Sequence, residues 1–135
     1  MTEAETLVQA YYAAFNAGDF AAMLALLTDD VEHGINQGGR EIGRDAFARF
    51  MAGMDESYSE RLADLVVMSD PSGTRAAAEF VVHGTYKHTA PGLPEAHGQT
   101  YVLPAGAFFT LRNGQVARID NFYNLQDWLR QVQGA

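Results

Sequence analysis

Residues 11–20, YYAAFNAGDF, continued by LLTDDV at 26–31, decide the fold of this chain. Apolar side chains recur at helical spacing through Leu7, Tyr11 and Phe15. Such a stripe on one face predicts an amphipathic first helix whose apolar side packs against other parts of the chain.

Capping signals flank this helix and introduce a second one. Thr2 and Glu5 have the spacing of a capping box, and Gly18 is a natural helix terminator. Asp19 follows at once and predicts the cap of a second helix. The core face of that helix is expected to include Phe20, Met23, Leu24 and Leu27.

A short strand and a third helix are expected next. Residues 31–36 predict a strand that ends before the turn at Gly38 and Gly39. Asp45 then lies in the first turn of a helix that fades near residues 55–58. Its apolar face is formed by Phe47, Phe50, Met51 and Met54.

The pattern changes after Arg61 to runs of alternating, β-branched and aromatic residues. Turn signals separate these runs, and Asn113–Gly114 is a strong hairpin signal. Helices early and antiparallel strands late predict a single α+β domain over residues 1–135. The expected strands cover 62–68, 75–89, 99–112 and 115–123, and a closing helix covers 125–133.

Composition excludes several classes of function. The 135 residues carry a net charge of −8 and no cluster of Lys or Arg, so a nucleic-acid partner is not expected. Cysteine is absent, which excludes disulfides and thiolate chemistry. The sequence shows neither a secretory signal nor an apolar run of about 18 residues, so we expect a cytoplasmic protein without a membrane partner.

The opening helices, together with Gly43, the helix around Phe47 and Phe50 and the segment Asn121–Asn124, resemble a known superfamily. They are similar to the ketosteroid isomerase-related and SnoaL-like polyketide cyclase branch of the nuclear transport factor 2-like proteins. The resemblance implies a cone-shaped curved antiparallel sheet wrapped around N-terminal helices, a cystatin-like α+β roll. It also implies a deep apolar pocket for a small lipophilic molecule and a homodimer formed through the outer face of the sheet.

The ketosteroid isomerase mechanism itself is not expected. Tyr11 matches the tyrosine that the family uses in its oxyanion hole, but positions 34–36 hold no carboxylate base. Gly106 and Ala107 stand where the protonated acid is expected. Two of three chemical groups are therefore missing, unless Glu32, Glu79 or Asp120 supplies the base.

The sequence allows two orientations of the strand at residues 75–89, which differ in the side chains that point inward. Amphipathicity places Phe80 and Val82 inside, whereas alignment with the family places Glu79 and His83 inside. In the second register, the carboxylate and the imidazole form a candidate acid–base pair. His33 is a further candidate because imidazole titrates near neutrality, and Tyr11 completes the candidate catalytic set.

Two functions are consistent with these residues. The first is a cofactor-free acid–base enzyme of the isomerase, cyclase, dehydratase or epoxide hydrolase type, acting on a compact lipophilic substrate. The alternative is a noncatalytic ligand-binding or dimeric interaction module. Neither metal-ligand spacing nor a phosphate loop is present, so no metal or cofactor is expected. The expected pocket residues are Phe15, Asn36, Phe50, Met51, Met54, Tyr101, Asn121 and Tyr123.

Overall fold

The computed structural model describes residues 1–134 and begins with the two expected helices, α1 (Glu3–Asn16) and α2 (Phe20–Ala25). The capping box is confirmed, because the Thr2 hydroxyl accepts a hydrogen bond from the Glu5 amide at 3.1 Å and the Glu5 carboxylate accepts one from the Thr2 amide. Asp19 caps α2 by accepting from the Ala22 amide at 3.1 Å. Local capping chemistry thus fixes where both helices begin.

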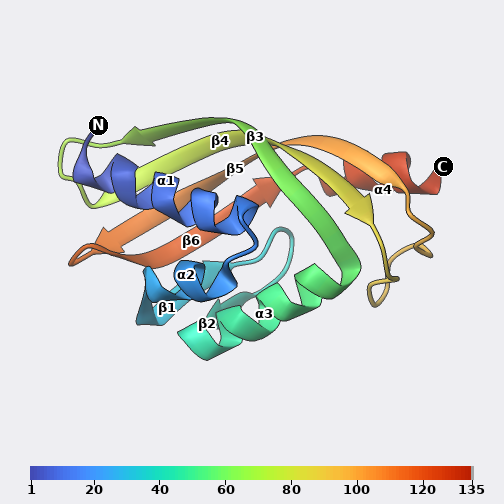
Figure 1. The fold of residues 1–135 in the computed structure, drawn as a ribbon, viewed down its shortest axis with the longest axis horizontal. Coiled ribbons are helices and arrows are strands. Elements are labelled where there is room, and N and C mark those ends of the chain that lie inside the picture. Colours follow the sequence, from blue (N-terminus) through green and yellow to red (C-terminus); the bar gives the residue numbers. More distant parts are fainter. Residues whose placement is uncertain (135) are drawn as a thin grey trace.

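The remaining chain forms a sheet and two more helices (Figure 1). The strands follow the order β2-β1-β6-β5-β4-β3, and all neighbours are antiparallel except β1 and β6, which are parallel. The elements are β1 (Leu27–Gly34), β2 (Arg40–Ile42), α3 (Arg44–Ser57), β3 (Tyr58–Ser69), β4 (Arg75–Tyr86), β5 (Thr100–Arg112), β6 (Gln115–Tyr123) and α4 (Leu125–Gln133).

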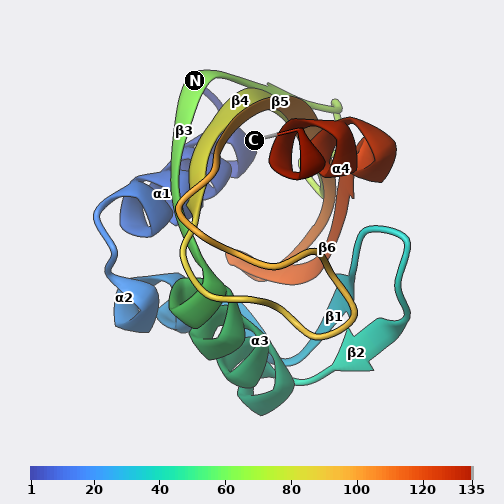
Figure 2. The ribbon, with the colours of Figure 1, turned by 90° about the vertical axis from the view of Figure 1, so that its right-hand side faces the viewer.

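The sheet is strongly curved, and α1 lies along its concave side (Figure 2). Val8 of α1 and Phe109 and Ile119 of the sheet are fully buried between these layers. The helices α2 and α3 continue the enclosure beside β1, and α4 lies at the end where β6 finishes (Figure 1). The predicted α+β cone with N-terminal helices is therefore confirmed.

The turn between β5 and β6 is the hairpin that the sequence predicted. Asn113 and Gly114 both have positive φ angles, of 52° and 75°. Two adjacent residues in that region form the type I′ turn that suits the right-handed twist of paired strands.

The start of the sheet differs from the prediction. Leu27 was expected on α2, but that helix ends at Ala25 and Leu27 is fully buried as the first residue of β1. Asp29 and Asp30 interrupt the helical pattern and were expected to precede the strand. They lie instead within β1, where they are exposed and pair with Arg44 at 2.9 Å and with Arg112 at 2.6 Å, respectively. The strand therefore begins four residues before the expected Val31. Its start was missed because exposed aspartates are uncommon in strands.

No helix in the described part of the chain is both long and apolar enough to cross a membrane.

Candidate functional site

A cavity of about 170 Å³ lies between the concave face of the sheet and the helices α1 and α3. An apolar cavity of about 150 Å³ holds one benzene molecule, so this volume suits a compound of about one ring. The walls are largely aromatic and aliphatic. They include Tyr11, Tyr12, Phe15, Met23, His33, Ile35, Asn36, Phe47, Phe50, Met51, Met54, Tyr58, Glu60, Leu62, Phe80, Val82, Leu93, Leu103, Ala105, Gly106, Asn121, Tyr123, Leu125 and Trp128.

The helical wall contains the residues that helical periodicity had suggested. Tyr11 and Phe15 of α1 line the cavity, as do the α3 residues Phe50, Met51 and Met54. These side chains share one face of each helix, which is why periodicity could find them.

Tyr12 also lines the cavity, although the sequence favoured Tyr11 as the functional tyrosine of α1. Its ring meets that of Tyr11 edge to face, with centroids 5.0 Å apart. The Tyr12 hydroxyl is buried and has no hydrogen-bond partner within the described chain. Buried hydroxyls are normally paired, so this one calls for an explanation.

His33 of β1 forms a polar contact inside the cavity with Asn121 of β6. Its side chain is almost completely buried, at 2% exposure, and packs against the rings of Phe47 and Phe50. Burial lowers the pKa of His33, and the charges of nearby carboxylates oppose this shift only in part. Nε2 of the neutral ring can therefore accept a hydrogen bond from Nδ2 of Asn121, which lies 3.3 Å away.

Asn36 lies in the turn after β1 and joins this turn to the end of β6. Its Oδ1 accepts a hydrogen bond from the Tyr123 backbone amide at 3.0 Å, which fixes the orientation of the side-chain amide. The Nδ2 donor is buried and has no partner among residues 1–134. Asn36, Asn121 and Tyr123 all line the cavity, in the positions expected from the sequence.

Glu60 of β3 is the polar cavity residue that the sequence reasoning missed. Burial raises the pKa of its carboxyl group, while a hydrogen bond donated by the Tyr101 hydroxyl acts in the opposite direction. That bond is short, with 2.5 Å between Tyr101 Oη and Glu60 Oε2. A carboxyl group with a raised pKa on an apolar wall has the properties of a general acid or base.

The reason for missing Glu60 is the predicted start of β3. The strand was expected from residue 62, whereas it begins at Tyr58 directly after α3. With that start, alternation places Tyr58, Glu60 and Leu62 on the same inner face. Tyr101 was expected in the cavity wall, but it lies behind Glu60, buried to 2% exposure, and contacts the site through this carboxyl group.

The proposed pair Glu79 and His83 does not belong to the cavity. Phe80 and Val82 line it, so strand alternation directs Glu79 and His83 to the outer face, where Glu79 is exposed. The register taken from amphipathicity is therefore right and the one taken from the family alignment is wrong. The apolar side chains bury on the concave side, and a shift by one residue would bring a carboxylate there instead.

The other carboxylates considered as bases are also poorly placed. Glu32 is exposed and lies 3.7 Å from Arg40. Burial would raise the pKa of Asp120, but Arg40 and Arg118 reverse this effect and lower it overall. An ion-paired carboxylate of this kind is a weak proton acceptor.

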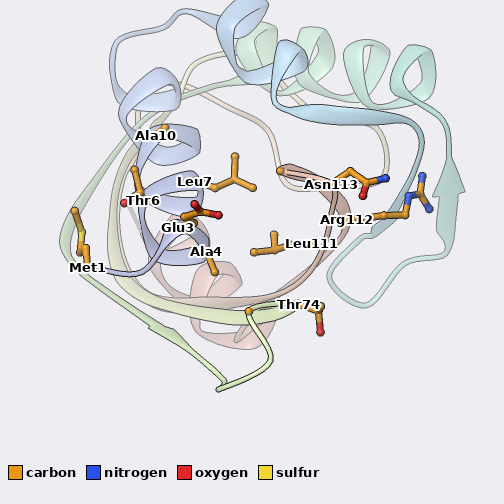
Figure 3. A pocket seen from close by; sticks show the side chains of 12 residues that line it. Met1, Glu3, Ala4, Thr6, Leu7, Ala10, Thr74, Leu111, Arg112 and Asn113 are labelled. Atoms are coloured by element: carbon orange, nitrogen blue, oxygen red, sulfur yellow. The ribbon is translucent and has the colours of Figure 1, made fainter.

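A second hollow lies near the start of α1 and is open to solvent (Figure 3). It is formed by residues of α1, the turn before β4 and the β5–β6 hairpin. Arg112, which lines it, is engaged by Asp30 at 2.6 Å. None of its lining residues has a buried side-chain polar atom without a partner, so this hollow lacks the chemistry of the cavity beside α1 and α3.

Comparison with known proteins places the chain in a family. The family model of the SnoaL-like domain matches residues 8–119. A candidate polyketide cyclase from Pseudomonas putida is 61% identical, with a TM-score of 0.95 and 98% of each chain covered. Another candidate polyketide cyclase, from Xanthomonas campestris pv. campestris, is 60% identical, with a TM-score of 0.94 and 96% of each chain covered.

A more distant structure shares the fold. A nuclear transport factor 2-like protein of unknown function from Burkholderia pseudomallei is 19% identical, with a TM-score of 0.83 over 98% of each chain. None of the functionally curated proteins matches this chain. From the match over residues 8–119, the chain belongs to the SnoaL-like domain family.

Proposed function

We propose that this protein is a cofactor-free acid–base enzyme that acts on a compact, neutral carbonyl compound. The observation that carries this proposal is Glu60, a carboxyl group with a raised pKa in the wall of an apolar cavity. The sequence similarity to two candidate polyketide cyclases supports a carbonyl substrate. The cavity volume of about 170 Å³ favours a substrate portion of about one ring.

The chemistry is a proton transfer at carbon. Glu60 in its charged form removes a proton from the carbon next to the carbonyl group; the electrons of that C–H bond move to the carbonyl oxygen and give an enolate. Protonated Glu60 then returns the proton to the same or another atom. A base whose pKa is raised toward the working pH suits this exchange in both directions.

The enolate oxygen needs a hydrogen-bond donor in the cavity. Tyr12 is a candidate because its hydroxyl is buried and unpaired within the described chain, as are Nδ2 of Asn36 and Nδ1 of His33. Tyr11 beside it lines the same wall. The wall contains neither Lys nor Arg, so the cavity offers no countercharge to an anionic substrate.

Hydrogen–deuterium exchange of cyclohexanone tests this proposal without knowledge of the natural substrate. The loss of its α-proton signal in D₂O is followed by NMR for the unmodified protein and for Glu60→Gln. We expect Glu60→Gln to slow the protein-dependent exchange by about 10²–10⁴-fold, the usual contribution of a general base. Glu79→Gln, a matched change on the outer face, should leave the rate unchanged; equal rates for all three proteins would refute the role of Glu60.

Ligand binding without catalysis is the second candidate function. It is favoured by the absence of a carboxylate at residues 34–36 and at Gly106 and Ala107. Trp128 is the only tryptophan of the chain and lines the cavity, so its fluorescence reports occupancy. Quenching by cyclohexanone, together with no exchange above the buffer rate, would establish binding alone.

We also propose that the protein forms a homodimer through the outer face of the sheet. Several large apolar side chains on this face are about half exposed, which is unusual for a surface that meets only water. Phe108 and Phe122 form an edge-to-face pair there, with centroids 5.6 Å apart. The other members of this apolar patch are Val66, Met68 and Val102.

A further inference from the structure

Glu60, Gly84 and Tyr101 form one row across three strands. Glu60 of β3 is paired with Gly84 of β4, and Gly84 is paired in turn with Tyr101 of β5. The hydrogen bond between Tyr101 and Glu60 therefore passes over Gly84. With strands about 4.8 Å apart, the two backbones joined by this bond are separated by roughly 9.6 Å.

Gly84 makes this crossing possible because it has no side chain. A Cβ atom at position 84 would lie 2.2–2.4 Å from three atoms of the Tyr101 side chain, namely Cζ, Cε2 and Oη. Such distances are far below van der Waals contact, so the Tyr101 ring could not keep its place over Gly84. The backbone of Gly84 is not in the left-handed region, so the strand conformation itself does not require glycine.

We infer that Gly84 is a positioning residue that holds the Tyr101 ring over β4 and thereby orients the Glu60 carboxyl group. The hydrogen bond engages Oε2 and not Oε1, so we expect Oε1 to be the atom that exchanges the proton with the substrate. This inference rests on the proposed function for the chemistry that Glu60 performs. The position of the Tyr101 ring over Gly84 can be tested without any substrate.

The direct readout is the pKa of Glu60, measured by ¹³C NMR titration of its side-chain carboxyl carbon. Glu60→Gln assigns the signal. The Tyr101 hydrogen bond favours the charged carboxylate, so Tyr101→Phe should raise the Glu60 pKa. Gly84→Ala should raise it in the same direction and by a similar amount, because it displaces the ring.

The double variant Gly84→Ala/Tyr101→Phe should titrate like Tyr101→Phe alone, since no hydrogen bond is left to lose. Gly53→Ala is the control, because a Cβ at that exposed helical position meets nothing within 4 Å. It should leave the Glu60 pKa unchanged. A folded Gly84→Ala protein with the Glu60 pKa of the unmodified protein would overturn the inference.

Folding of Gly84→Ala is monitored by circular dichroism. If the variant does not fold, Gly84→Ala is compared in the Tyr101→Ala background, where the ring that blocks the new methyl group is absent. Gly84→Ala/Tyr101→Ala should then unfold at the same urea concentration as Tyr101→Ala alone, and a clearly lower stability of the double variant would overturn the inference. Absence of cyclohexanone exchange in the unmodified protein would refute the proposed function, but the titration would still decide the role of Gly84.

Discussion

Tyr12 and Asn36 each bring to the cavity wall a buried polar atom without a hydrogen-bond partner in the described chain. Leaving such a group unpaired costs about 1–3 kcal/mol. A ligand oxygen that accepts from these donors would recover that cost when it binds. The two residues are therefore better explained by ligand recognition than by stability of the empty protein.

Removing the Tyr12 hydroxyl tests this explanation. Tyr12→Phe should keep or slightly raise the free energy of unfolding in urea, because an unpaired buried group is lost. The same change should weaken quenching of Trp128 fluorescence by cyclohexanone.

Tyr86→Phe is the matched comparison. The Tyr86 hydroxyl donates to the Pro94 carbonyl at 2.6 Å and accepts from the Ala90 amide at 2.9 Å. Its removal should lower the free energy of unfolding by about 1–3 kcal/mol, as expected for loss of paired buried groups. A similar loss in Tyr12→Phe would show that its hydroxyl has a structural partner.

Glu60 also predicts a pH dependence of stability. Its pKa in the folded protein is raised from 4.5, so between 4.5 and the folded pKa the folded state binds more protons than the unfolded state. The stabilisation from the neutral carboxyl group is thus fully present below the unfolded pKa and is lost as pH rises through the folded pKa.

Glu60→Gln removes this titration while its amide oxygen can still accept from Tyr101. As pH rises above about 4.5, the unmodified protein should lose free energy of unfolding that Glu60→Gln keeps. The stability of the variant relative to the unmodified protein should therefore increase with pH. Urea denaturation at several pH values measures the difference. Parallel stability curves would mean that the Glu60 pKa is not raised in the folded state.

At the scale of elements, local signals in the sequence predicted most of the fold. The caps Thr2 and Asp19 and the turn Asn113–Gly114 each depend on residues close in sequence, and each is found as expected. Periodicity likewise found the apolar faces of α1 and α3, which line the cavity in the structure. These features need no knowledge of distant parts of the chain.

The features that the sequence could not settle depend on contacts between distant segments. The side of β4 that faces the cavity is set by packing against α1, as in the contact between Phe80 and Tyr12 at 5.0 Å between centroids. Glu60 was missed because α3 runs into β3 without a turn signal. Its partner Tyr101 lies 41 residues away, so no local pattern joins them.

The turn between β1 and β2 is expected to hold the end of β6 in place. Asn36→Ala removes the hydrogen bond that ties this turn to the Tyr123 amide at the end of β6. Hydrogen exchange of the Tyr123 amide, followed by NMR, should become faster, while amides of the β5–β6 hairpin should keep their rates. Unchanged exchange at Tyr123 would show that the strand end is held by other contacts.

For the whole molecule, the net charge of −8 and the apolar patch on the outer sheet face act in opposite directions. Repulsion between copies keeps acidic proteins apart, whereas an exposed apolar patch favours association. The proposed homodimer forms only if burial of this apolar patch stabilises it by more than the repulsion between the two negatively charged copies destabilises it.

Phe108→Lys tests the dimer by placing a charge beside Phe122 in the apolar patch. Light scattering coupled to size-exclusion chromatography should show a dimer for the unmodified protein and a monomer for this variant. Ala52→Lys adds the same charge at an exposed position of α3 and should remain dimeric. A monomeric unmodified protein would contradict the proposed assembly.

If Glu60 transfers a proton inside the cavity, the pH dependence of cyclohexanone exchange must follow the ionisation of this residue. We expect the exchange rate to rise with pH through a midpoint equal to the Glu60 pKa measured by NMR, and we expect Glu60→Gln to abolish this rise. A midpoint at a different pH, or the same profile in Glu60→Gln, would show that Glu60 is not the base.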